Sequence, residues 1–126
     1  MMSQKPDLSS LRAALDRLGA ALAQPRTEWT RDAAIQRFEF TFELAWKAAA
    51  KFARREGVAA PSPREAFRAA MSLGWIADEP LWLGMLEDRN RTSHTYSERT
   101  AEEIYGRLSA YHAALIELMG RLDGLS

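Results

Sequence analysis

One short segment, residues 87–98, combines residue types that can act on a phosphate ester. It reads EDRNRTSHTYSE and includes Arg89, Asn90, His94 and Tyr96, in a chain with only two histidines. Histidine titrates near neutral pH, so an imidazole here can accept or donate a proton. Arginine presents a rigid fork of N–H donors that suits phosphate oxygens. Together they have the chemistry to cleave RNA without a metal, with the base removing the 2′-hydroxyl proton and the guanidinium stabilising the phosphorane.

The spacing of these residues leaves two interpretations open. On an unbroken helix Arg89 and His94 would diverge by about 140°, whereas Asn90 and His94 would lie about 40° apart. The residues TSHT at 92–95 favour a loosened helix end, because Ser and Thr compete for backbone hydrogen bonds. A bend there would let the arginine and the histidine converge on one ligand. The alternative is that Arg89 pairs with Glu87 or another neighbouring acid, while His94 caps a helix end.

A second polar group lies on the predicted second helix, which is otherwise rich in aromatic residues. It consists of Gln36, Glu39, Glu43 and Lys47. These residues form either a solvated face with one Glu43–Lys47 ion pair or a strip that contacts a substrate or a partner. No HExxH motif, carboxylate-rich loop, glycine-rich phosphate loop or Cys/His cluster is present, so the sequence implies neither a metal nor a cofactor.

The elements that must position these side chains are all helices. Apolar residues recur at spacings of three and four, and no segment alternates with period two. The expected helices lie within 7–25, 30–57 and 62–74, from about 78 onward, and within 100–122. Thr30 is expected to cap the second helix, and Thr100 with Glu103 to form a capping box on the last. The pattern predicts an all-α, antiparallel four- or five-helix bundle in a single domain, residues 1–126, with its core at about 8–123.

Aromatic residues predict how the bundle associates. Trp46 and Phe40 broaden the apolar stripe of the second helix, which is therefore expected to be buried on more than one side. Four tryptophans are more than a bundle of 126 residues needs, and such residues are enriched at interfaces, so a homodimer is expected. These are Trp29, Trp46, Trp75 and Trp82.

Charge and composition limit the class of protein. Lys+Arg and Asp+Glu are both 17, so the chain has no large electrostatic attraction for nucleic acid and any phosphate contact must be local. Cysteine is absent, which suits a reducing cytoplasm. No run of about 18 apolar residues predicts a membrane span, and the start of the chain lacks the apolar core of a signal peptide. A cytoplasmic protein without membrane contact is expected.

Three blocks of sequence resemble the nucleotidyltransferase substrate-binding proteins, which are small helical members of the HEPN superfamily. The blocks are AIQRFEFTFELAWKAAAKF at 34–52, SPREAFRAA at 62–70 and DRNRTSHTY at 88–96. They occur in the same order, and the resemblance runs from about residue 8 to 123. It implies a four- or five-helix bundle that forms homodimers.

The resemblance also implies roles for the first motif. The HEPN signature is Arg-x4-6-His, often Arg-Asn-x3-His followed by x-Tyr, and residues 89–96 match it in full. In ribonuclease members two such motifs meet across the dimer to form one cleft. Arg89 and His94 would then be catalytic, and Asn90 and Tyr96 would support them.

The resemblance implies a partner as well. In the toxin–antitoxin branch the HEPN protein is the toxin, and a minimal nucleotidyltransferase encoded nearby is the antitoxin. In that branch the antitoxin adenylylates the motif tyrosine, here Tyr96, beside Arg89 and Arg91. A different implication is a non-catalytic subunit that binds a nucleotide or other substrate for its partner nucleotidyltransferase.

Overall fold

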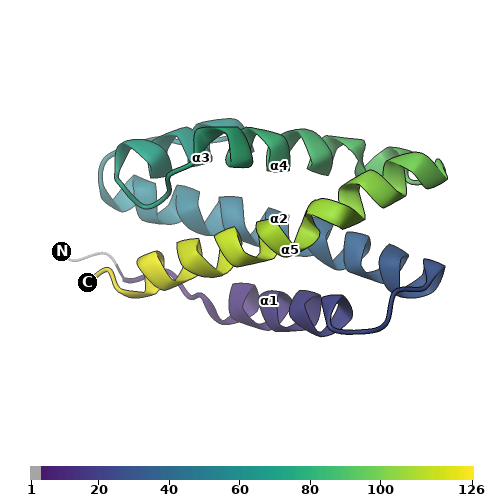
Figure 1. The fold of residues 1–126 in the computed structure, drawn as a ribbon. Helices are drawn as coiled ribbons and strands as arrows, with labels where there is room; N and C mark the ends of the chain where they lie inside the picture. The colour runs from purple at the N-terminus through teal and green to yellow at the C-terminus, as the bar shows by residue number, and fades with distance from the viewer. Residues whose placement is uncertain (1–3) are drawn as a thin grey trace.

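The computed structural model describes residues 4–126 as five α-helices and one 3-10 helix (Figure 1). They are α1 (Ser9–Leu22), α2 (Glu28–Arg55), α3 (Pro63–Ser72), α4 (Glu79–Arg91), η1 (Thr92–His94) and α5 (Glu98–Asp123). No strand occurs in this part of the chain, so the all-α prediction is confirmed. None of the described helices combines the length and apolarity that crossing a membrane requires.

The two longest helices, α2 and α5, run in the same direction (Figure 1). Arg31 near the start of α2 donates to Glu98 at the start of α5, and Arg55 at the end of α2 donates to the backbone carbonyl of Ser126. The antiparallel arrangement predicted for the bundle therefore applies to α1 with α2 and to α4 with α5, but not to this central pair.

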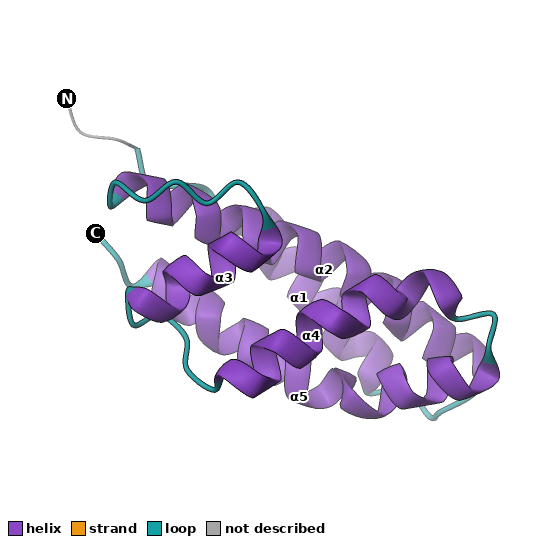
Figure 2. Ribbon diagram, turned by 90° about the horizontal axis from the view of Figure 1, so that it is seen from above, coloured by secondary structure: helices purple, strands orange, loops and turns teal. Residues whose placement is uncertain are grey.

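The parallel arrangement follows from the connection between α2 and α3. Gly57, with φ +81°, ends α2 in a left-handed conformation, and residues 56–62 then lead the chain back toward the middle of the bundle (Figure 2). Phe67 consequently packs on Phe42 and Trp75 on Phe52, with ring centroids 5.5 and 6.4 Å apart. From the first contact to the second, the residue numbers increase on both sides, from 42 to 52 and from 67 to 75. The chain from α3 onward to Trp75 therefore runs along α2 in the same direction.

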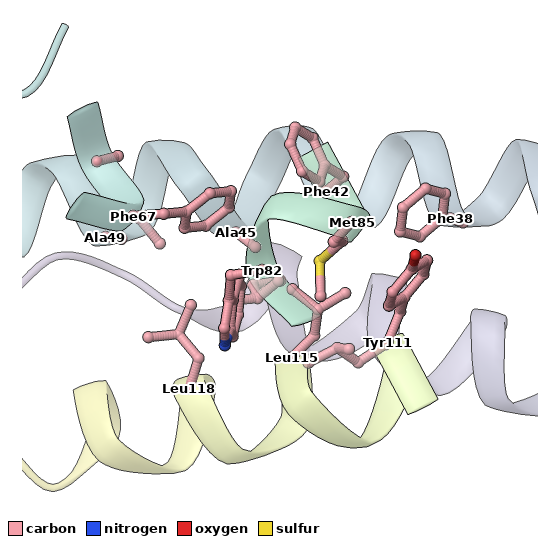
Figure 3. Packing of buried hydrophobic residues seen from close by; sticks show 14 of the residues in the cluster. Phe38, Phe42, Ala45, Ala49, Phe67, Trp82, Met85, Tyr111, Leu115 and Leu118 are labelled. Atoms are coloured by element: carbon pink, nitrogen blue, oxygen red, sulfur yellow. The ribbon is translucent and has the colours of Figure 1, made fainter. Parts of the chain in front are cut away.

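Aromatic side chains occupy the centre of the core and join four helices (Figure 3). Phe38 of α2 stacks on Tyr111 of α5 at 5.6 Å, and Phe67 of α3 packs on Trp82 of α4 at 4.8 Å. Met85 of α4 lies fully buried among them. This packing places the first half and the middle of α4 among side chains of α2, α3 and α5.

Two predicted helix starts are three residues too late. Thr27 caps α2, since its hydroxyl accepts the Thr30 backbone N–H at 3.0 Å and the Thr30 hydroxyl accepts the Thr27 N–H at 2.7 Å. Ser97 caps α5 by accepting the Thr100 N–H at 3.3 Å. In both cases a hydroxyl three residues upstream of the expected cap takes the role. Glu103 is not part of a cap but accepts from arginine side chains.

The aromatic residues divide between core and surface differently from the prediction. Trp75 and Trp82 are 7% and 4% exposed, so they belong to the core of one chain and are not available to a partner. Phe40 is 60% exposed and does not broaden the buried stripe of α2. Trp46 is half-buried, and Trp29 at the start of α2 is 85% exposed. The surplus of aromatic surface is thus smaller than the count of tryptophans indicated.

Candidate functional site

The Arg-x4-His segment lies where α4 ends and the chain turns into α5. The helix tightens into η1 because two threonine hydroxyls donate hydrogen bonds to backbone carbonyls. Thr92 donates to the carbonyl of Arg89 at 2.7 Å, and Thr95 donates to that of Thr92 at 3.2 Å. The α-helix ends before residues 92–95 as predicted, but the chain there tightens into a 3-10 turn and does not loosen. His94 is therefore carried by a tight turn and not by the helix that carries Arg89.

Arg89 points from α4 toward α2. Its guanidinium lies over the ring of Phe42, 5.7 Å from the centroid, and Nη2 donates to Glu43. Glu43 also accepts from the indole N–H of Trp46 at 3.1 Å and lies 4.0 Å from Lys47. The neighbouring acid anticipated for Arg89 is thus Glu43 on another helix. With its side chain 38% exposed, Arg89 is oriented by Glu43 and still reaches solvent.

His94 and Tyr96 both face solvent. Their ring centroids are 5.9 Å apart, the ring planes meet at 76°, and Tyr96 is 85% exposed. No hydrogen bond between residues 4–126 joins the His94 ring to Arg89, so within one chain the two side chains lie on successive elements, η1 and α4, without a hydrogen bond between them. Asn90, on the last turn of α4, is exposed beside them.

The polar strip of α2 contributes one residue to this site. Gln36 and Lys47 are exposed, and Glu39 and Glu43 are half-buried. Within the described chain, Glu43 is the member that contacts the Arg-x4-His segment. The Glu43–Lys47 pair of the alternative interpretation is also present, at the limit of an ion pair.

Arg91 is held inside its own chain. It donates to Glu103 of α5 at 2.9 Å and to Asp88 at 3.3 Å, and Glu103 also accepts from Arg99 at 3.2 Å. The hydrogen bond to Glu103 raises the pKa of Arg91. Within one chain Arg91 therefore ties α4 to α5, and its contact with a partner or substrate stays a prediction.

Asp88, immediately before Arg89, is the main structural residue that the sequence did not reveal. It is 3% exposed and accepts from Arg107 at 2.6 and 3.0 Å and from the hydroxyl of Tyr111 at 2.6 Å. Its position in the sequence does indicate burial. Asp88 lies three residues after the buried Met85, at a position of α4 where the helical period predicts an apolar side chain.

The carboxylate of Asp88 is ionised in this network. Burial by itself raises the pKa of Asp88, but hydrogen bonds from Arg107 and Tyr111 and the nearby charges outweigh burial, so the pKa lies below its ordinary value. Burial, followed by the hydrogen bond to Asp88, raises the pKa of Tyr111, and the hydrogen bond from Arg107 to Asp88 raises that of Arg107. The end of α4 is therefore fixed to α5 by a charge-assisted network.

A second buried charge fixes the start of α5. Arg31 is 1% exposed and donates to Glu98 at 2.7 Å, to Glu102 at 3.0 Å and to Asp32 at 2.9 Å. Its hydrogen bond to Glu98 raises the pKa of Arg31 and lowers that of Glu98. Because Glu98 follows Tyr96 by two residues, Arg31 holds the far side of the turn that presents His94.

Metal ligands do not gather at this site or elsewhere in residues 4–126, where no group of three or more His, Cys, Asp and Glu side chains is close enough to hold an ion.

The fold and the site define a class of protein: an all-helical bundle with Arg-x4-His at the junction of its fourth helix and the following turn. The chain belongs to the family described as nucleotidyltransferase substrate binding protein like, whose model matches residues 6–124. The resemblance of the three sequence blocks to this HEPN-like family is confirmed.

Relatives and solved structures agree with this family. The chain is 30% identical over 83 residues to a Haemophilus influenzae protein named probable ribonuclease HepT, covering 62% of this chain and 57% of that protein. It thus spans a little over half the length of this curated relative. A crystal structure of a Thermus thermophilus protein is similar with a TM-score of 0.85 and 40% identity, over 89% of this chain and 98% of that one. The H. influenzae protein HI0074, described as a substrate binding domain of a nucleotidyltransferase, has a TM-score of 0.83 and 25% identity, over 93% and 99%.

Proposed function

We propose that this chain is the HEPN-type toxin of a toxin–antitoxin pair with a nucleotidyltransferase, and that it is a metal-independent endoribonuclease. The observation that carries the proposal is the presentation of an exposed imidazole, His94, on the turn directly after the helix that holds the Arg89 guanidinium. A relative named probable ribonuclease supports it. Asp88 and Arg31 hold the two sides of that turn, which gives the site the rigidity that positioned catalysis requires.

The proposed reaction is a transesterification. His94 takes the proton of a 2′-hydroxyl, the 2′ oxygen attacks the adjacent phosphorus, and Arg89 stabilises the charge of the phosphorane. The bond from phosphorus to the 5′ oxygen then breaks, and that oxygen takes a proton from an imidazolium or from water. The products are a 2′,3′-cyclic phosphate and a 5′-hydroxyl end, with no net change in oxidation state.

Glu43 has a positioning role in this proposal. A guanidinium has five N–H donors, and Glu43 accepts from Nη2, so the remaining donors are free to face a phosphate. The Phe42 ring under the guanidinium restricts its motion further. Arg89 is thereby aimed before any substrate arrives.

The protein is expected to be a homodimer. Trp29, Phe40 and Tyr96 are large aromatic side chains that one chain leaves exposed, and a second copy would also bring a second Arg89 and His94 to the same cleft. Light scattering at tens of micromolar should give about twice the 14.2 kDa mass of one chain. A strictly monomeric mass at that concentration contradicts this prediction and the composite cleft with it.

Tyr96 is proposed as the residue that the partner nucleotidyltransferase modifies. Its 85% exposure makes the hydroxyl accessible, and an attached nucleotide would place an anion beside His94 and Arg89, filling the cleft that RNA needs. Incubation with the cognate enzyme and ATP should add one nucleotide to the peptide that contains Tyr96, as measured by mass spectrometry, and should abolish cleavage without unfolding.

Tyr105 is the control for this modification, because it is a half-buried tyrosine on α5 outside the motif. A Tyr105→Phe protein should still be modified and silenced, whereas Tyr96→Phe should stay active in the presence of the partner. Adducts on another residue, or none with an active nucleotidyltransferase, remove the regulatory role of Tyr96.

The second candidate function is a non-catalytic subunit that binds a nucleotide or another substrate for the nucleotidyltransferase. It is favoured by the ion pairs of Arg89 and Arg91 with carboxylates, by the balanced charge, and by the description of HI0074. Expression of the chain alone, with and without His94→Ala, distinguishes the two functions. Growth arrest that depends on His94 supports the ribonuclease, and harmless expression with intact binding to the partner supports the subunit.

A further inference from the structure

A groove between α3 and α4 lies outside the residues assigned so far. Its volume is about 290 Å³, and its apolar lining includes Phe67 of α3 with Trp82, Leu83 and Leu86 of α4. Leu83 is 45% exposed, which is unusual for a leucine in a bundle that buries most of its apolar side chains. The groove is thus a small hydrophobic hollow that opens to solvent.

Two arginines line the α3 side of this hollow. Arg64 and Arg68 are one helical turn apart, and both are exposed. Neither forms an ion pair with a carboxylate of residues 4–126, whereas Arg31, Arg89 and Arg107 each do. Two guanidinium groups without an ion pair in the described chain, beside an apolar hollow, have the chemistry to bind a ligand with an anionic group and a flat or apolar body.

The groove leads to the Arg-x4-His segment. Leu86, which lines it, lies four residues before Asn90, so the two side chains are about 40° apart and one turn apart on the same face of α4. Asn90 is exposed and directly follows Arg89. Since α3 and α4 run in opposite directions, Arg64 lies toward this end of the groove, and Glu79, the acidic residue of the lining, lies toward the other.

We propose that this groove binds a nucleotide of the RNA strand on which Arg89 and His94 act. The base enters the hollow against Leu83, the exposed apolar residue of its lining, and the phosphates contact Arg64 and Arg68. Single-stranded RNA is recognised in this way, through unstacked bases held on apolar and aromatic groups and phosphates held by arginine. The inference rests on the proposed function, and it adds the path of the substrate strand away from the cleaved bond.

The size of the groove favours a nucleotide over a protein segment. Ligand pockets begin at about 300 Å³, whereas a stable protein interface buries about 800 Å² on each partner. In a chain without net charge, a local pair of arginines is also the kind of phosphate contact that RNA binding requires.

The test is the binding of a fluorescein-labelled single-stranded RNA to the full chain carrying His94→Ala, which prevents cleavage during the measurement. Adding Arg64→Ala and Arg68→Ala should weaken binding about tenfold and reduce the slope of log K against log salt by about 1.4, since each phosphate contact on a single strand contributes about 0.7. Leu83→Glu, at an exposed position, should also weaken binding by placing a negative charge in the groove. Arg54→Ala is the matched control, because Arg54 is an exposed arginine in the last turn of α2, away from the groove.

Each outcome supports or overturns the groove separately from the ribonuclease. Binding that depends on Arg64 and Arg68, in a chain that never cleaves RNA, supports RNA binding in the groove and contradicts the proposed reaction. Cleavage with a KM that both substitutions leave unchanged contradicts RNA binding in the groove and leaves the proposed reaction intact. Failure of the wild-type chain to bind RNA overturns the inference. A double variant that keeps RNA binding but no longer binds the nucleotidyltransferase also overturns it, and identifies the groove as a protein-docking surface.

Discussion

Replacement of His94 by alanine should lower the rate of RNA cleavage by about 100-fold or more, because it removes the proposed general base for the 2′-hydroxyl proton. Arg89→Ala should cause a loss of about the same size, because the phosphorane then forms without its cation. His94 is exposed and Arg89 is partly exposed, so both variants should fold like the wild type. The measurement is the initial rate of cleavage of a labelled RNA, with circular dichroism as the check on folding.

The second histidine of the chain provides the control. His112 on α5 has its Nε2 atom 2.9 Å from the backbone carbonyl of Leu15, where it joins α5 to α1 away from the motif. His112→Ala should keep the wild-type rate even where it lowers stability slightly. The mechanism would be wrong if the His94→Ala chain cleaved RNA at the wild-type rate, or if EDTA abolished cleavage.

Asp88→Ala should lower the free energy of unfolding by about 2–3 kcal/mol. Breaking a fully buried ion pair costs about 3–5 kcal/mol, but the Arg107 side chain is 43% exposed and can turn to water. The remaining cost has two sources. The buried hydroxyl of Tyr111 loses its acceptor, which costs about 1–3 kcal/mol, and the connection between α4 and α5 is lost. Because a domain of this size has only about 5–15 kcal/mol in total, urea unfolding should detect the change clearly.

Two comparisons identify the network as the cause. Asp16→Ala, at an exposed position of α1, should change stability by no more than about 0.5 kcal/mol. At acidic pH, Asp88→Ala should lower the free energy of unfolding by less, because the folded pKa of Asp88 lies below its unfolded value. The contribution of Asp88 is then complete above the unfolded pKa of about 3.9 and is lost as the pH falls through the folded one. An effect of equal size at all pH values argues against the ionised carboxylate.

The helices and the motif were predictable from the sequence because both depend on local spacing. Hydrogen bonds within a helix join residues four apart, so the leucines of α1 and α5 marked two helices, and Gly57 marked the end of α2. The end of α4 followed in the same way from a run of Ser and Thr, whose hydroxyls reach only nearby carbonyls and here hold a 3-10 turn. The Arg89-x4-His94 spacing is itself a local pattern.

Only the tertiary structure decided which side chains those residues contact. Glu43 and Arg89 are 46 positions apart, and Asp88 and Tyr111 are 23 apart, so no local periodicity relates them. Their contacts depend on the direction in which α3 returns along α2 and on the depth at which α4 packs against α5. The same packing buries Trp75 and Trp82 and leaves Trp29 exposed, although all are tryptophans of a helical chain. Local sequence thus determined which residues form the candidate site, and packing between helices determined how Arg89 is held and which arginines form no ion pair among residues 4–126.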